Sequence, residues 1–213
     1  MTKTEIQRNA IADLLKDGQN ATWTELQAIG VERRAVLGMI ASGELLRVDH
    51  NVYRLAAANP GKFPEWEDIA KKYSDFVVCL LSAAQFHGLT VHLPDQLWVG
   101  LPLGSKPTNL TVRCVQYPRN PDDRRWTVGV DTITDGTHSF NVTSRERTIV
   151  DLFIWRKRLP DGERFFAEAI NEFDAQNGSR ALLAKIGAEF GVDRAISERL
   201  VWKGHVENAR SIY

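Results

Sequence analysis

The sequence lacks a surplus of charge of either sign, because 27 Lys and Arg residues balance 27 Asp and Glu residues. Counted by segment, the net charge is 0 over 1–60, −1 over 61–143 and +1 over 144–213. Composition alone therefore excludes a strongly basic nucleic-acid-binding domain. If the protein binds DNA, folding must bring its scattered cations together on one surface.

Cysteine and long apolar runs are also scarce. Cys79 and Cys114 lie far apart in apolar surroundings, which indicates buried free thiols and fits a reducing cytoplasm. No run approaches the ~18 apolar residues that a membrane helix needs, and the charged first residues do not resemble a secretory signal. We therefore expect a cytoplasmic protein with no membrane partner, and 213 residues suffice for one large domain or two small ones.

The first sixty residues contain the spacing of three helices. Apolar positions recur at helical spacing over 4–17, and Thr22-Trp23-Thr24-Glu25 fits a capping box that opens a short second helix ending near Ala28. Gly30 supplies a turn with an expected positive φ. A third helix is predicted over 32–42, with Val36, Met39 and Ile40 on its apolar side and Gly43 after its end.

Two short helices joined by a tight glycine turn are typical of a helix-turn-helix, in which the second helix presents its first residues to DNA. Arg33, Arg34 and Leu37 fall on the face opposite the apolar side. Arginine suits this position because its planar fork bonds guanine bidentately or holds a phosphate. We predict these three residues as DNA contacts.

A hairpin is predicted directly after the third helix. Leu45-Leu46-Arg47-Val48 and Val52-Tyr53-Arg54-Leu55 are strand-forming runs, and Asp49-His50-Asn51 joins them as a turn. A hairpin in this position is a wing, and it predicts further contacts to the DNA backbone or minor groove. The candidate wing contacts are Arg47, His50, Asn51 and Arg54.

The small, turn-forming residues 56–64 make the best linker in the chain, so we predict domains at 1–58 and 65–213. In the second domain, helices are expected over 65–73 and 75–88, followed by strands over 97–101, 110–115, 126–133 and 139–142. Further helices are expected from Thr143 and over 163–175, 179–190 and 193–209. The fold class is thus α+β: a winged helix-turn-helix domain, then a larger α+β domain with a small sheet and C-terminal helices.

Motifs for catalysis or cofactor binding are missing from the sequence. It contains no Gly-rich phosphate loop, no Gly-x-Ser-x-Gly elbow and no Cys-x-x-Cys pair, and its five histidines lack zinc-helix spacing. We expect no cofactor, no metal and no enzymatic activity. Asp122 and Asp123 fit a solvated turn better than a metal site.

The best cluster of polar candidates lies in the second domain, and a structural role in hydrogen bonding is favoured over a catalytic one. Its members are Ser82, His87, Arg147, Thr148 and Asp151.

Three stretches together resemble the AbiEi-type antitoxins of bacterial type IV toxin–antitoxin systems, over nearly the whole chain. They are Gly43-Glu44-Leu45-Leu46-Arg47 with Val52-Tyr53-Arg54-Leu55, then Leu80-Leu81-Ser82-Ala83-Ala84-Gln85-Phe86-His87-Gly88-Leu89-Thr90, and Arg145-Glu146-Arg147-Thr148-Ile149-Val150-Asp151.

The resemblance implies a winged domain that binds inverted repeats in double-stranded promoter DNA and represses its own operon. It also implies a larger domain that counters a cognate nucleotidyltransferase-like toxin, by direct contact or otherwise. By position, Arg33 and Arg34 would contact the major groove or phosphates, and Arg47 and Arg54 would belong to the wing.

Other interpretations remain open. The neutral first domain suits a winged-helix protein-interaction module that does not touch DNA, or a transcriptional regulator outside a toxin–antitoxin operon. A nuclease built on the second domain's sheet would need clustered carboxylates or a lysine at strand ends, and the sequence offers no such cluster. Metal-dependent DNA cleavage that substitution of Asp131 or Asp151 abolishes would support this alternative.

Overall fold

The computed structural model describes residues 2–16, 20–57, 62–107, 112–135 and 138–200. The chain forms two compact units, the first comprising 1–76 with 134–140 and the second comprising 77–133 with 141–213. Helices and two separate sheets make up the fold, which confirms the α+β class. We predicted domains of 1–58 and 65–213; the division found here falls after Phe76 and assigns the tip of a later hairpin to the first unit.

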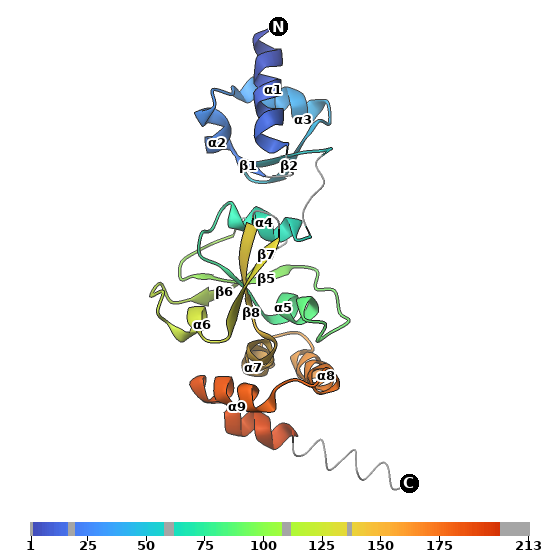
Figure 1. Cartoon of the computed structure of the whole chain (residues 1–213), viewed down its shortest axis with the longest axis vertical. Helices are drawn as coiled ribbons and strands as arrows, with labels where there is room; N and C mark the ends of the chain where they lie inside the picture. The colour runs from blue at the N-terminus through green and yellow to red at the C-terminus, as the bar shows by residue number, and fades with distance from the viewer. Residues whose placement is uncertain (1, 17–19, 58–61, 108–111, 136–137, 201–213) are drawn as a thin grey trace. The chain divides into compact units, whose positions relative to one another are not determined.

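The first unit places its first three helices beside a small antiparallel sheet of order β1-β3-β2 (Figure 1). Its buried apolar core includes Ile11, Leu15, Leu26, Val36 and Leu45. In chain order its elements are α1 (Lys3–Leu15), β1 (Ala21–Thr22), α2 (Trp23–Ala28), α3 (Arg33–Ala41), β2 (Leu45–Asp49), β3 (Val52–Leu55) and α4 (Pro64–Ala70).

Local sequence signals fix the start and end of α2. The Thr22 hydroxyl accepts a hydrogen bond from the Glu25 amide at 3.3 Å, and the Glu25 carboxylate accepts one from the Thr22 amide at 2.7 Å. The predicted capping box is therefore confirmed. Gly30 has φ +79°, also as predicted. The buried Val31 follows this turn, and α3 comes next.

The second unit is built around a mixed sheet of strand order β6-β5-β4-β8-β7, in which β4 runs antiparallel to β5 and parallel to β8. The hairpin of β7 and β8 crosses the division between the units, since residues 134–140 group with the first. The strands are β4 (Val77–Val78), β5 (Leu97–Pro102), β6 (Val112–Tyr117), β7 (Val130–Asp135) and β8 (His138–Thr143).

Helix α7 is the centre of the second unit, with α5, α8 and α9 all packed against it (Figure 1). Most of its side chains are buried, including Ile149, Val150 and Leu152. The helices are α5 (Leu80–Phe86), α6 (Arg124–Thr127), α7 (Arg145–Trp155), α8 (Gly162–Ala175) and α9 (Arg180–Glu189), and 193–200 is also helical. The rest of the helix predicted over 193–209 lies outside the described residues.

Two predicted segments are wrong in part. The apolar stretch 75–88 does not form one helix, because Val77–Val78 is the central strand β4 and the helix begins only at Leu80. A continuous apolar run fits a buried strand as well as a buried helix, so periodicity could not separate them. The strand predicted over 126–133 begins at Val130, because Asp123 caps the short helix α6 before it.

Both cysteines are free thiols, Cys79 buried and Cys114 half-buried. In the described part of the chain, no helix combines the length and apolarity needed to cross a membrane.

Candidate nucleic-acid interface

Helix α3 turns one face to the core of the first unit and the other to solvent. The buried face consists of Ala35, Val36 and Met39. Arg33, Arg34 and Leu37 are exposed, and the Leu37 side chain is 57% exposed although apolar. The three residues predicted as contacts on this helix are therefore together on its solvent face.

No ion pair to Arg33 or Arg34 is found among the residues that the structure describes. The Arg33 guanidinium lies 6.0 Å from the ring centroid of Trp23, on α2. Such a stacked arginine keeps its charge and most of its donors available. Sequence analysis missed this contact, although an aromatic residue in the helix before an arginine-bearing helix was a usable signal.

Arg34 lies at a hollow of about 660 Å³ between α1 and α3. The charged residues of its lining are Lys3, Arg8, Glu32 and Arg34. Glu32 already pairs with Lys3 across the two helices, and Arg8 pairs with Glu44. Since Lys3 and Arg8 are each paired with a carboxylate, Arg34 is the cation of this lining for which the described structure shows no ion pair.

Two of the predicted wing contacts on the hairpin of β2 and β3 are exposed to solvent. Arg47 and His50 are exposed, and an Arg47 guanidinium nitrogen lies 3.1 Å from His50 Nδ1, which accepts in that contact. Asn51 is half-buried in the left-handed region at φ +59°, a conformation that asparagine tolerates. Its carbonyl accepts a hydrogen bond from the Trp23 amide at 2.8 Å, so Asn51 ties the turn to α2.

Arg54 is placed differently from Arg47. It is half-buried, and its Nη1 is fully buried without a hydrogen-bond partner in the described ranges. The carboxyl group of Glu67 on α4 is buried, which raises its pKa, while the neighbouring Arg54 opposes that rise. The charge of Arg54 thus acts on the buried carboxyl group of Glu67, and no sequence pattern linked β3 to α4.

The polar cluster predicted in the second unit falls into separate groups. The Ser82 hydroxyl accepts from the Trp98 amide at 2.9 Å, and His87 Nε2 donates to the Thr143 carbonyl at 2.6 Å. Burial lowers the pKa of His87, so its neutral form is favoured. The hydrogen bonds of these two side chains connect α5 to β5 and to the end of β8, as a structural role requires.

Arg147 and Asp151 form the other group. Their side chains make an ion pair at 2.9 Å, one turn apart on α7, as their spacing predicted. Thr148 instead bonds the Thr143 hydroxyl at 2.8 Å. Neither Ser82 nor His87 joins this pair, so the cluster does not provide a nucleophile with an adjacent base.

Within the described ranges, no three His, Cys, Asp or Glu side chains are grouped so as to hold a metal ion. Of the two loop carboxylates, Asp122 is exposed, whereas Asp123 caps α6 by accepting from the Arg125 amide at 2.9 Å.

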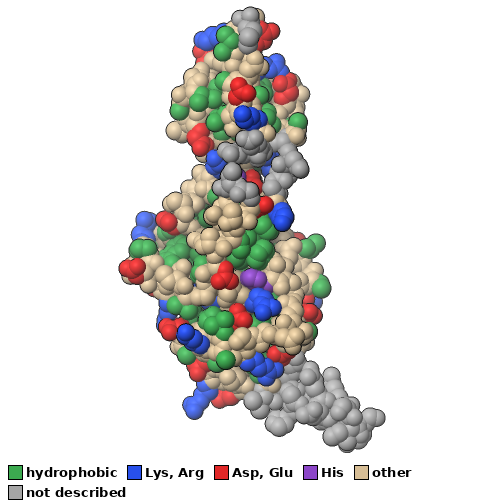
Figure 2. All heavy atoms as spheres, in the orientation of Figure 1, with side chains coloured by type: hydrophobic (Ala, Val, Ile, Leu, Met, Phe, Trp, Pro, Cys, Tyr) green, Lys and Arg blue, Asp and Glu red, His purple; other side chains and the backbone are tan. Residues whose placement is uncertain are grey.

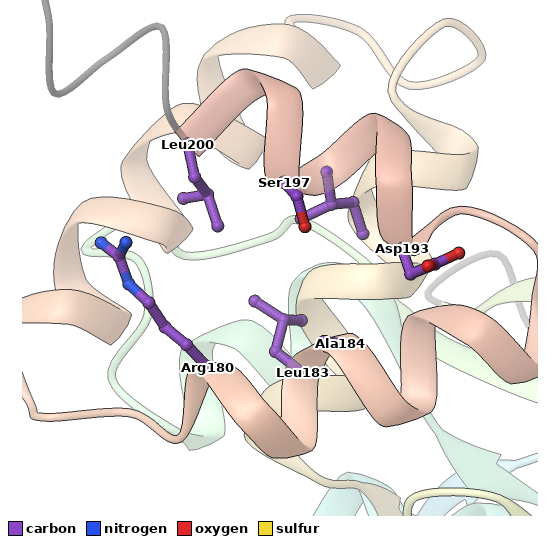
Figure 3. A pocket seen from close by; sticks show the side chains of 7 residues that line it. Arg180, Leu183, Ala184, Asp193, Ser197 and Leu200 are labelled. Carbon is purple, nitrogen blue, oxygen red and sulfur yellow. The ribbon is translucent and has the colours of Figure 1, made fainter.

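A small cavity of about 160 Å³ lies between α9 and the helix over 193–200 (Figure 3). Leu183 and Leu200 point into it from opposite sides, with Arg180 and Asp193 toward its ends. Its walls are mainly apolar and bring no catalytic group together. On the face drawn in Figure 2, basic and acidic side chains are interspersed rather than gathered by sign.

The chain matches no model of a known protein family. Comparison with curated proteins likewise gives no significant match.

Proposed function

We propose that this chain is a DNA-binding antitoxin and autorepressor of the AbiEi type, and that residues 1–58 act as a winged helix-turn-helix. One observation carries the proposal. Arg33, Arg34 and Leu37 share the solvent face of α3, and neither arginine is paired with a carboxylate in the described structure. Two exposed arginines on one helix, without a carboxylate partner, suit a surface that meets phosphates or base edges.

The order of the elements supports the same assignment. Helices α2 and α3 are joined by the Gly30 turn, and the β2–β3 hairpin follows α3 directly. In this proposal α3 enters the major groove, and Arg47 and His50 on the hairpin approach the backbone beside it. Asn51 fixes the hairpin turn, while Arg54 serves the interior of the unit.

Affinity would come from two copies on an inverted repeat, because one neutral unit offers few phosphate contacts. Arg33 and Arg34, for which the described structure shows no ion pair, supply the positive charge that each copy presents on α3.

The toxin partner rests on the sequence resemblance alone. We propose that the second unit counters a nucleotidyltransferase-like toxin in the cytoplasm without catalysis of its own. Co-expression tests this: the toxin encoded beside this gene should stop growth, and the full chain should restore it. Growth arrest that the full chain fails to relieve would remove the antitoxin role but leave DNA binding intact.

The DNA-binding role is tested by a gel shift with the promoter of the protein's own operon. Wild type should shift the promoter fragment but not a scrambled fragment, and Arg33→Ala/Arg34→Ala should bind it more weakly. The matched control is Arg164→Ala/Arg180→Ala, which removes two exposed arginines that pair with Asp161 and Asp174 in the second unit. Equal affinity of the α3 variant and the control variant would exclude the α3 contacts.

A second candidate is a winged protein-interaction module, favoured by the zero net charge of residues 1–60. It predicts no promoter shift even at low salt, where phosphate contacts are strongest.

A further inference from the structure

The second unit contains a larger cavity whose lining suits a ligand. It measures about 500 Å³ and lies between β6, α6, α7 and the chain after α9. Leu80, Val115, Ile154, Trp155, Phe190 and Val192 provide its apolar and aromatic walls. Pockets of this volume, with apolar walls and a few placed polar groups, are typical of small-molecule sites.

The charged residues of this cavity have an excess of cations. Four arginines and two aspartates line it, and no lysine or glutamate does. The arginines are Arg124, Arg125, Arg147 and Arg158.

These arginines differ in how many of their guanidinium donors are already bound by other residues of the protein. Arg147 is held by Asp151 and by the Val128 carbonyl, at 2.9 and 2.5 Å, and Arg125 pairs with Asp123 at 2.9 Å. Arg158 is exposed, makes no ion pair that the described residues show, and lies 5.1 Å from the Trp155 ring centroid. Its guanidinium group is therefore free to receive an anion.

Asp151 supplies an acceptor at the same cavity. It is 7% exposed, and one of its carboxylate oxygens accepts from Arg147 Nε. The other oxygen is buried without a hydrogen-bond partner in the described part of the chain. Burial raises the pKa of this carboxyl group, against the attraction of Arg147. An unpaired buried acceptor is costly, and a donor from a ligand would offset that cost.

The cavity wall also contains a strained residue. Leu80 begins α5 with φ +49°, in the left-handed region that a branched side chain rarely adopts. Strain of this kind is concentrated at functional sites.

We propose that this cavity binds a small anion that carries a planar ring with an N–H donor, the chemistry of a nucleotide. The anionic group binds Arg158 at the rim, with Arg124 and Arg125 beside it. The ring lies against Trp155, and its donor bonds the Asp151 carboxylate. This site is separate from the DNA-binding surface, and its test does not depend on that proposal.

Titration calorimetry on the full chain tests the site with four probes: AMP, GMP, CMP and UMP. Uncharged nucleosides and inorganic phosphate form separate arms. At least one nucleotide should bind, and more tightly than either its nucleoside or phosphate. Arg158→Ala should weaken that binding about tenfold or more, the size of one lost charge-assisted hydrogen bond.

Arg164→Ala is the matched control, because Arg164 is exposed on α8 and does not line the cavity. It should leave nucleotide affinity unchanged. Asp151→Asn should weaken the binding of nucleotide but not of phosphate. The proposal is overturned if no nucleotide binds, if Arg158→Ala binds as tightly as wild type, or if phosphate alone binds as tightly as the nucleotides.

Discussion

Replacing Arg147 with Met should unfold the second unit more readily than any surface change of similar size. Arg147 is 1% exposed, and its guanidinium group pairs with Asp151, donates to the Val128 carbonyl and lies 4.1 Å from the Phe190 ring centroid. The Met side chain keeps much of the volume but leaves the Asp151 carboxylate buried and unpaired. Removing one partner of a buried ion pair costs about 3–5 kcal/mol.

Urea denaturation gives this loss as a change in the free energy of unfolding at pH 7. On heating, the same loss lowers the melting temperature by roughly 6–20 °C for a protein of this size. Arg164→Met is the control, since Arg164 is exposed, pairs with the exposed Asp161 at 3.6 Å and lies 5.1 Å from the Phe165 ring centroid. Its change should stay within about 0.5 kcal/mol.

A double-mutant cycle then tests the physical reason for the loss. Arg147→Met/Asp151→Leu leaves no unpaired buried charge, so it should cost less than the sum of its two single variants. A loss below about 1 kcal/mol in Arg147→Met, or strict additivity in the cycle, would refute the argument that the uncompensated charge dominates.

Three further predictions concern local features. Burial lowers the pKa of His87 in the folded protein, so His87 is protonated at a higher pH in the unfolded chain than in the folded one. Acidification from pH 7 through 6.5 should therefore lower the free energy of unfolding, and His87→Gln should flatten that dependence. Gly129→Ala should destabilise more than Gly191→Ala in urea: both glycines have a positive φ, but only at Gly129 would the new Cβ lie 2.7 Å from the Arg147 Cβ. Thr22→Ala should cost about 1 kcal/mol in urea by opening the α2 capping box, and rescue by Ser, but not by Val, would identify the hydroxyl as the cause.

The sequence predicted elements well where a local signal marks their ends. Thr22 with Glu25 marks the start of α2 and Gly30 marks the turn after it, because a cap and a positive φ depend on neighbouring residues. The prediction from sequence failed at Val77–Val78, because an apolar run is compatible with both a strand and a helix. Pairing with β5 and β8 makes these residues a strand.

The candidate sites show the same limit. The exposed position of Arg33 and Arg34 was predictable, because the face of a helix on which a residue lies follows from periodicity. The sequence could not distinguish Arg54 from Arg47, because the partial burial of Arg54 depends on the folded structure around β3. The cavity beside Arg158 joins residues from five separate stretches of the chain, which no local pattern connects.

The salt dependence of promoter binding tests the central claim, that the α3 arginines contact DNA. The logarithm of the binding constant falls with the logarithm of salt concentration by about 0.9 for each phosphate contact. With two arginines on each of two copies, Arg33→Ala/Arg34→Ala should weaken binding and reduce the steepness by up to about 3.6 if all four contact phosphates. Affinity and salt dependence both equal to those of wild type would contradict the account.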